Sequence, residues 1–415
     1  MKLVSRASLA VALALGMVAT GVATPAFAKK EPKAPAQYAP QLSKEFRVAI
    51  GAAQVAAKAG NAADTAAKLA VAEPLALQPD EKFYLGVVRY DLSKLNKDNV
   101  MGRKAINEMI ASNSKLITNG AELNFAAGNL AYVAGDYVDA VAKFNEADRL
   151  GSKNVDRLLL LAEANFKQGQ VLPGLAFVER AVTESEAAGQ KAPEGWYMRA
   201  ASVAYKAKLN SEVAKWTRAQ VKAYPTAENW RSALVTYRDG SRLEGHMALD
   251  LLRLMRLTKS LAGERDFFEY ASLAVDRALP GEAKSTIEEG FATGVVSKSS
   301  RAVSEVLTLA TSRIPADRAS IVTSEKQANA AGATGKPAAG AGDAYLGYGE
   351  DAKAVPYYKM ALQKGGVDAD QVNTRLGIAL ARSGQKEEAR KYFSAVGGAR
   401  ADIAKFWLLY VDLNP

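Results

Sequence analysis

The chain has 415 residues, of which 49% are hydrophobic, and a formal net charge of +10. It contains no cysteine and a single histidine, which excludes disulfide bonds, thiol chemistry, a lipoprotein anchor, and histidine-based triads and zinc motifs. Alanine-rich helical segments dominate over β-branched runs, so we expect an all-α fold with a large core.

Residues 1–28 have the features of an export signal. Lys2 and Arg6 precede a short apolar run, and Ala26-Phe27-Ala28 matches an A-x-A cleavage site. A membrane anchor would need about 20 apolar residues. We therefore expect cleavage before Lys29 and a periplasmic or secreted protein with no membrane span.

The rest of the chain divides by composition. Residues 29–40 hold three prolines among lysines and alanines, which is typical of a flexible tether. Residues 41–325 are predicted to form one helical array. The Gly/Ala-rich stretch 326–342 is either a mobile linker or a poor first helix for the Ala354 repeat, and we favour a linker that leads into a short helix. A helix from Ser300 to Arg313 is expected to stop at Ile314-Pro315. Residues 343–415 are predicted to be a C-terminal repeat pair with a capping helix.

The clearest internal pattern lies in residues 124–150. Gly128 and Ala140 are small, as required where two helices cross closely, and Phe144 fills the gap beyond the contact. Gly135 lies between the two predicted helices, where a residue that tolerates positive φ is needed, and Asp136 follows as a helix cap. A hairpin of this size cannot bury its second face alone, so it needs copies of itself on each side.

Copies of this pattern occur downstream in nearly fixed register. The most similar ones are Gly169, Gly174, Val178 and Ala181, then Gly349, Ala354, Tyr358 and Ala361, then Gly384, Ala389, Phe393 and Val396. With these residues the chain resembles the tetratricopeptide repeat family. The resemblance implies a right-handed superhelical solenoid of antiparallel helix pairs, whose first helices line a concave groove that binds peptides.

The resemblance also suggests which side chains face that groove. Counting along the first helix of each unit gives Glu122, Phe125, Asn129 and Tyr132, then Leu159, Glu163 and Phe166, then Tyr197 and Tyr205. Tyr132 and Phe166 can equally pack between units. The carboxylate clamp of some family members is missing: Asn129 matches it, but Phe125, Leu160, Glu194 and Met198 occupy the other four places.

The remaining chemistry favours binding over catalysis. His246 lies in a polar turn, so a solvated or helical histidine is expected rather than a general base. The glycines of residues 340–350 lack the Lys-Ser/Thr of a phosphate loop, and no basic stripe with aromatics predicts nucleic-acid binding. We expect no cofactor and no metal site.

Two classes of function remain. The first is a non-catalytic protein–protein interaction scaffold of the bacterial cell envelope, which binds a protein or peptide segment in its groove. The alternative is an accessory platform subunit of an envelope enzyme, or of a polysaccharide- or peptidoglycan-processing complex. Repeats extend almost to the end of the sequence and leave no room for a catalytic domain, so the scaffold is the expected function.

Overall fold

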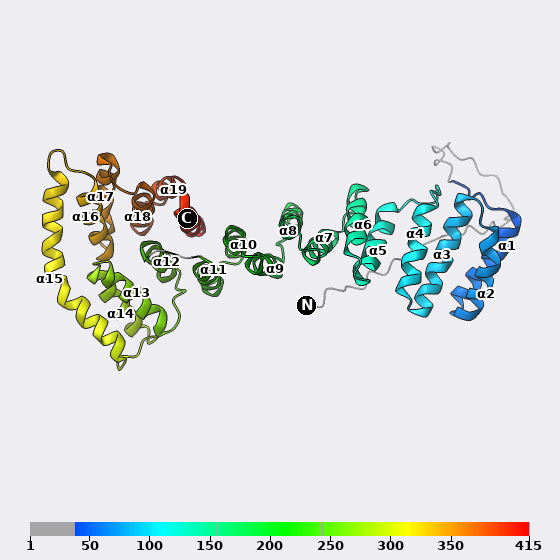
Figure 1. The fold of residues 1–415 in the computed structure, drawn as a ribbon, viewed down its shortest axis with the longest axis horizontal. Coiled ribbons are helices and arrows are strands. Elements are labelled where there is room, and N and C mark those ends of the chain that lie inside the picture. Colours follow the sequence, from blue (N-terminus) through cyan, green and yellow to red (C-terminus); the bar gives the residue numbers. More distant parts are fainter. Residues whose placement is uncertain (1–37, 155, 242, 244, 415) are drawn as a thin grey trace, which may run out of the picture. The chain divides into compact units, whose positions relative to one another are not determined.

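The computed structural model describes residues 38–414 except residues 155, 242 and 244. The predicted signal peptide and most of the predicted tether lie outside the described residues. Every regular element within the described residues is helical, as the sequence predicts (Figure 1). The internal contacts divide the chain into two compact units, Met1–Gln190 (unit 1) and Lys191–Pro415 (unit 2).

Unit 1 is a row of antiparallel helix pairs in which each helix packs on its neighbours in the sequence. Its elements are α1 (Lys44–Lys58), α2 (Ala62–Ala72), the 3-10 helix η1 (Glu73–Leu75), α3 (Pro79–Asn96), α4 (Asn99–Ala111), α5 (Gly120–Val133), α6 (Tyr137–Arg149), α7 (Asp156–Lys167) and α8 (Val171–Ala187). Because α4 packs on α5 and α6 on α7, successive pairs stack on one another, and Leu116 packs against two neighbouring core clusters. This is the solenoid arrangement that the repeats predict.

The α5–α6 pair confirms the analysis of residues 124–150. A Cβ on Gly128 would lie 2.7 Å from the Phe144 ring, so only glycine allows the helices to approach this closely. Gly135 ends the first helix with a φ of +80°, and the Asp136 side chain accepts a hydrogen bond from the backbone of Asp139 at 3.1 Å. Phe144 is fully buried.

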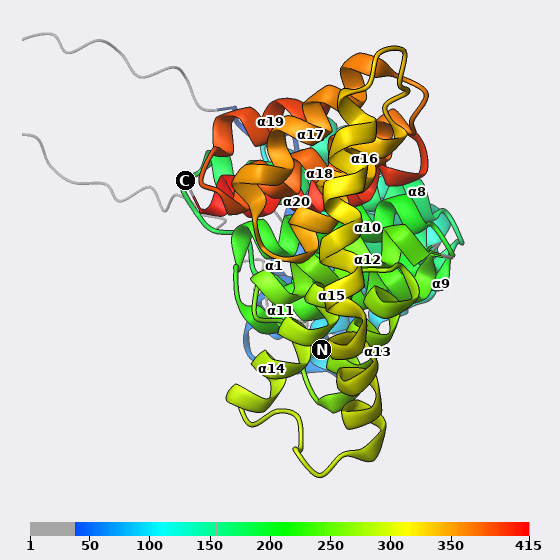
Figure 2. The same ribbon diagram turned by 90° about the vertical axis from the view of Figure 1, so that its left-hand side faces the viewer.

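Unit 2 contains the remaining helices. They are α9 (Glu194–Lys206), α10 (Asn210–Ala223), α11 (Ala227–Gly240), α12 (Gly245–Leu257), α13 (Glu264–Asp276), α14 (Pro280–Ala292), α15 (Arg301–Asn329), α16 (Lys336–Gly347), α17 (Asp351–Lys364), α18 (Ala369–Arg382), α19 (Lys386–Ser394), the 3-10 helix η2 (Gly398–Arg400) and α20 (Ala401–Leu413). The long helix α15 runs along the side of unit 2 that faces the viewer in Figure 2.

The favoured linker at residues 326–342 is wrong, because helices cover most of the stretch, and the alternative of a first helix for the Ala354 repeat is confirmed. The first residues of the stretch belong to α15, and Lys336 begins α16. Gly342 contacts Tyr358 as Gly128 contacts Phe144: a Cβ on Gly342 would lie 2.8 Å from the tyrosine ring. The small residues of this stretch are therefore packing positions of a repeat.

The predicted end of a helix at Pro315 is also wrong. Helix α15 continues through Pro315 to Asn329. Proline removes one helical hydrogen bond, but Pro315 and Thr311, whose carbonyl loses that bond, are both exposed, so water can satisfy the carbonyl. Beyond the proline, Tyr345 and Tyr357 donate hydrogen bonds to Glu325 at 2.6 and 2.7 Å and fix the second half of the helix.

The C-terminal residues 343–415 are not a separate domain, because they pack on α10 and α12 within unit 2. Phe406 contacts Tyr237 with 5.6 Å between ring centroids, and Trp407 is fully buried. The Trp407 indole donates to the carbonyl oxygen of Asp250 at 3.2 Å. The predicted capping helix α20 thus forms part of the core of unit 2.

A buried ionic cluster joins these C-terminal helices to α12. Asp250 is fully buried and accepts from Arg253 at 2.8 Å and from Arg400 at 2.7 Å, while Arg375 lies 3.7 Å away. Burial alone would raise the pKa of Asp250, but the three arginines more than offset burial and hold this pKa below its ordinary value.

His246 lies on a helix, which was one of the two predicted positions, at the edge of this cluster and not in a solvated turn. It is half-buried at the start of α12, and its Nδ1 lies 2.7 Å from Nη2 of Arg375. Burial and the charge of Arg375 lower the pKa of His246, so the imidazole is neutral at neutral pH.

Phe144→Ala is expected to lower the free energy of unfolding by about 3–5 kcal/mol, because it empties a fully buried aromatic site. The measurement is urea unfolding followed by circular dichroism, because unit 1 contains no tryptophan. Val138→Ala, on the same helix at a position 72% exposed, is the matched control and should be near neutral. Equal stability of the Phe144 variant and the parent would contradict the assigned packing.

Asp250→Asn is expected to destabilise unit 2 by about 3–5 kcal/mol at pH 7, because it removes the counter-charge of Arg400 and leaves Arg253 and Arg375 with only Glu282 and Asp343. The native pKa of Asp250 is lowered, so its stabilising contribution is present above the unfolded pKa of about 3.9 and is lost as the pH falls through the native value. The variant should therefore lose less stability than the parent between pH 7 and acid. Tryptophan fluorescence during urea unfolding reports this, since all four tryptophans lie in unit 2.

The exposed Asp276→Asn on α13 is the control for this experiment and should keep both the stability and the acid sensitivity of the parent. An Asp250→Asn variant with the same acid sensitivity as the parent would show that this carboxylate does not carry the effect.

Candidate protein-binding groove

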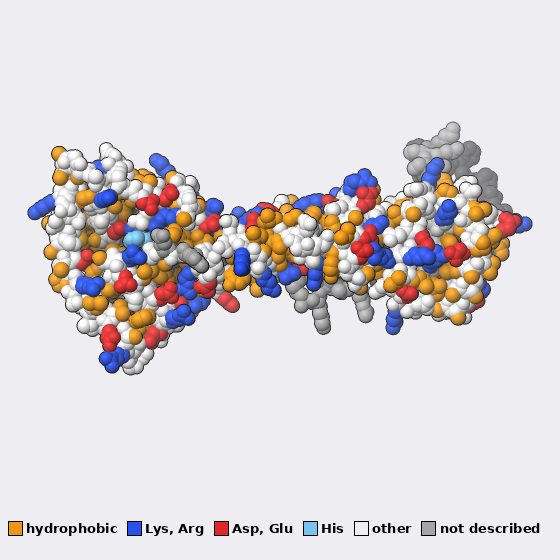
Figure 3. Space-filling view, in the orientation of Figure 1, with side chains coloured by type: hydrophobic (Ala, Val, Ile, Leu, Met, Phe, Trp, Pro, Cys, Tyr) orange, Lys and Arg blue, Asp and Glu red, His pale blue; other side chains and the backbone are white. Residues whose placement is uncertain are grey.

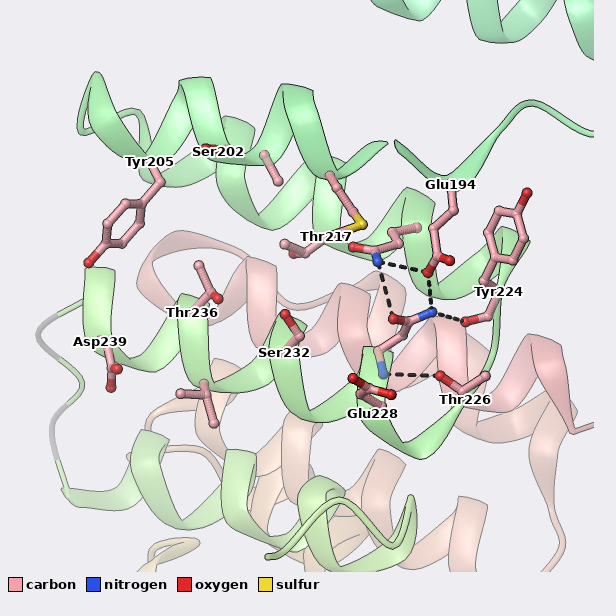
Figure 4. A pocket seen from close by; sticks show the side chains of 15 residues that line it. Glu194, Ser202, Tyr205, Thr217, Tyr224, Thr226, Glu228, Ser232, Thr236 and Asp239 are labelled. Atoms are coloured by element: carbon pink, nitrogen blue, oxygen red, sulfur yellow. Dashed lines mark hydrogen bonds between the residues drawn. The ribbon is translucent and has the colours of Figure 1, made fainter. Parts of the chain in front are cut away.

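Unit 2 contains a groove of about 680 Å³ between α9 and α11, with α10 and the turn that follows it as its floor (Figure 4). Its lining residues are Glu194, Met198, Ala201, Ser202, Tyr205, Thr217, Gln220, Tyr224, Thr226, Glu228, Asn229, Ser232, Val235, Thr236 and Asp239. Helices α9 and α11 are the first helices of two successive pairs. The groove therefore lies on the helices that the repeat pattern predicts to form a binding surface.

The width of the groove follows from the residues on the two facing helices. Ala201 and Ser202 on α9 and Ser232 on α11 are small, so the middle of the groove stays open. Met198 and Tyr205 lie on the same face of α9 and are 55% and 51% exposed. Both side chains are in contact with solvent beside a polar floor, so a chain bound in the groove would contact them.

One end of the floor is a fixed network around Glu194. Its Oε1 accepts hydrogen bonds from Gln220 Nε2 at 3.0 Å and from Asn229 Nδ2 at 2.7 Å (Figure 4). The hydrogen bond from Gln220, followed by that from Asn229, lowers the pKa of Glu194, so this carboxylate is ionised at neutral pH. The Asn229 amide also donates to the backbone oxygen of Tyr224 at 2.9 Å, which ties the network to the turn after α10.

The same turn is held by its aromatic residue. The Tyr224 hydroxyl donates to the backbone oxygen of Ala192 at 2.9 Å, and Lys191 Nζ lies 3.6 Å from the centre of the Tyr224 ring. Thr226 caps α11 by accepting from the backbone of Asn229 at 3.1 Å. This end of the groove is thus preorganised by backbone and side-chain hydrogen bonds together.

Tyr205 lines this groove as the sequence predicts, but Tyr197 does not. Tyr197 is 2% exposed and packs between Trp216 and Tyr224, with ring centroids 6.5 and 6.4 Å away. The buried face of α9 contains Tyr197, Ala200 and Ala204, and the groove face is the next one around the helix.

Phe125 is buried for the same reason. It is 5% exposed and contacts Phe144 at 5.7 Å between ring centroids, just as Tyr197 contacts Trp216. The two residues hold equivalent positions in their pairs. Both predictions of groove exposure are therefore wrong in the same way: each places a core position of the first helix on its binding face.

The other predicted residues of unit 1 are partly buried. Glu122 accepts a hydrogen bond from Ser152 at 3.5 Å, and the Tyr132 ring packs edge-on against Tyr137 at 5.4 Å. Phe166 packs against α8, because a Cβ on Gly174 would lie 2.3 Å from its ring. These aromatics hold helix pairs together.

The remaining residues named in the sequence analysis divide between the two units. Asn129 and Glu163 lie half-buried on α5 and α7 in unit 1. Glu194 and Met198, noted only because they break the carboxylate clamp, line the groove of unit 2. Sequence reasoning missed the α11 residues of the groove because it followed aromatic side chains, and the groove face of α11 carries none.

Other kinds of site find no support in the described part of the chain. Its histidine, aspartate and glutamate residues form no group of three or more that could hold a metal ion. No helix among residues 38–414 is both long and apolar enough to span a bilayer. On the face shown in Figure 3, basic and acidic side chains are intermixed over both units.

No protein-family model matches the sequence, and no curated protein does. Among solved structures, the chain is similar to a tetratricopeptide repeat protein from Parabacteroides merdae, with 11% identity and a TM-score of 0.30 over 79% of this chain and 98% of that one. It is also similar to the C-terminal part of a TPR repeat-containing protein from Cytophaga hutchinsonii, with 12% identity and a TM-score of 0.29 over 80% and 99%. The TPR2AB domain of yeast Sti1, solved in complex with pHSP90, matches with 14% identity and a TM-score of 0.24 over 71% and 95%.

The class of the protein follows from its own repeats. Successive helix pairs stack within each unit. In several pairs a glycine with a left-handed backbone conformation joins the two helices. In pairs from both units, a glycine of the first helix contacts an aromatic ring of the second. The chain has the tetratricopeptide repeat fold.

Proposed function

We propose that this protein is a non-catalytic interaction scaffold that holds a segment of another protein in the groove between α9 and α11. The observation that carries the proposal is the groove itself, with two half-exposed apolar side chains on one wall and mostly polar residues, two of them acidic, along the other. Exposed large apolar side chains that flank an open channel supply contact area, and Tyr205 does so at little cost in side-chain ordering because it has only two side-chain torsions.

The groove chemistry supports binding rather than catalysis. Serine and threonine hydroxyls line it, but no histidine lies among the lining residues to activate them. The chain's one histidine is next to Arg375. The carboxylate of Glu194 is ionised and is held by two amides, an arrangement that suits a fixed negative charge better than proton transfer.

We also propose that the scaffold acts in the cell envelope, after export and cleavage before Lys29. The support is the basic start, apolar run and Ala26-Phe27-Ala28 site of the sequence. The expected result is an intact mass of the exported protein that corresponds to a chain beginning at Lys29. A chain that keeps Met1 and fractionates with membranes would contradict both the cleavage and the location.

Filling the groove should abolish capture of the partner. Ser202 and Ser232 are exposed on facing helices, so Ser202→Trp with Ser232→Trp closes the channel without disturbing the core. We expect at least a tenfold loss of the specifically captured proteins, or about 1.4 kcal/mol, in quantitative mass spectrometry of affinity captures from an envelope extract.

Ser211→Trp is the matched control, because Ser211 is an exposed residue of α10 outside the groove. Both variants must show the helix content and unfolding midpoint of the parent. Capture of the same proteins at the same yield by the groove-filled variant would refute the proposed binding site.

A further inference from the structure

The charge of the groove differs from that of the whole chain. The protein carries 54 lysines and arginines against 44 acidic residues. Among the groove's lining residues, however, Glu194, Glu228 and Asp239 are acidic and none is a lysine or arginine. The binding surface is therefore anionic in a protein that is otherwise cationic.

Each of these carboxylates can accept a further hydrogen bond or form a further ion pair. Both amide hydrogen bonds of Glu194 go to Oε1, and its Oε2 accepts none within the described residues. Glu228 is exposed and forms no ion pair within the described part of the chain. Among the residues that the structure describes, Asp239 pairs with Arg238 Nε at 3.4 Å, and its side chain is 56% exposed.

Three basic residues beside the groove have contacts of their own. Lys191 lies over the Tyr224 ring, and its charge adds to the lowering of the pKa of Glu194. Arg238 is shared between Asp239 and Glu269, which lies 3.4 Å from it. Arg231 pairs with Asp266 and donates to the backbone oxygen of Ser260 at 3.0 Å. An incoming cation therefore meets walls whose negative charge is only partly balanced.

The spacing of the two acidic residues on α11 also determines how far apart two bound cationic groups would lie. Glu228 and Asp239 lie near opposite ends of the helix, about 16 Å apart along its axis at 1.5 Å per residue. An extended peptide covers that distance in about five residues. Between the two ends the groove offers Met198, Tyr205 and Val235 to apolar side chains.

We propose that the groove takes an extended protein segment with two basic residues about four or six positions apart, an even spacing that puts both side chains on one face of the segment, and apolar residues between them. One lysine or arginine lies at Glu228 and the open Oε2 of Glu194, and the other lies at Asp239. This inference rests on the proposed function and adds the chemical class of the partner to it.

The test is selection of a random peptide library, displayed on phage, against the full chain. Peptides with paired lysine or arginine residues should be enriched. The best one is then synthesised with a fluorescent label, and its affinity is measured by anisotropy for the parent, Glu228→Gln and Asp239→Asn. Each substitution should weaken binding roughly two- to fivefold, in the range of exposed ion pairs, and added salt should weaken it further.

A double-mutant cycle assigns the contacts. Replacing one basic residue of the peptide with glutamine should remove the effect of Glu228→Gln and leave that of Asp239→Asn, and the other basic residue should do the reverse. Glu288→Gln, an exposed acid on α14 outside the groove, is the control and should bind as the parent does.

The outcomes separate the two proposals. Neutral or acidic peptides that bind the parent and are lost in the groove-filled Ser202/Ser232 variant would overturn the cationic partner but keep the groove as the binding site. Peptides that bind the groove-filled variant equally well, or the absence of any enriched peptide, would overturn both.

Discussion

The close approach of paired helices is the constraint on which the rest of this structure depends. At Gly128, Gly342 and Gly377, a Cβ would lie 2.6–2.8 Å from the aromatic ring of the following helix. The rings in question, Phe144, Tyr358 and Phe393, are almost completely buried. Because this contact fixes which face of the first helix is core, it also fixes which face is left for a partner.

In the α11–α12 pair, a carboxylate occupies the position that corresponds to the aromatic ring of the α5–α6 pair. Asp250 follows Leu234 at the spacing at which Phe144 follows Gly128, and it is equally buried. A buried charge must be paired, and here Arg375 and Arg400 from the C-terminal helices supply part of the counter-charge. Asp250 therefore links α12 to the C-terminal helices, in addition to the apolar contacts of Phe406 and Trp407.

This packing bears on the groove. Helix α20 contacts α10 and α12, and its Phe406 lies against Tyr237 of α11. Tyr237 is buried and is not a lining residue of the groove. Arg218 on α10 also pairs with Asp402 on α20 at 3.2 Å. Helix α20 thus packs on α10 and α11, which form the floor and one wall of the groove, on the side away from the groove. Because this packing supports the two helices, small side chains can line an open channel.

Much of the fold could be predicted from the sequence, because helix pairing is a local property. Spacing located Gly128, Gly135 and Phe144 correctly. The same spacing links Gly342 to Tyr358, but composition suggested a linker there, since alanine and glycine carry no apolar bulk to signal a core. The ionic cluster around Asp250 joins residues far apart in the sequence, and no periodicity reports such contacts.

The site was harder to predict than the fold. An aromatic side chain on the first helix can face the core or the groove. A shift of one position along the helix is enough to move it from one face to the other. Phe125 and Tyr197 are core residues, whereas Tyr205 lines the groove. The groove face of α11 consists mostly of small and polar residues, which in a sequence resemble an ordinary solvated helix face.

The most direct test of the binding surface is hydrogen–deuterium exchange of the full chain with and without a saturating peptide selected against it. The structure predicts slower amide exchange in α9 and α11, where the peptide would lie, and unchanged exchange in α5 and α7 of unit 1. Slower exchange confined to α5 and α7, with α9 and α11 unaffected, would contradict this account.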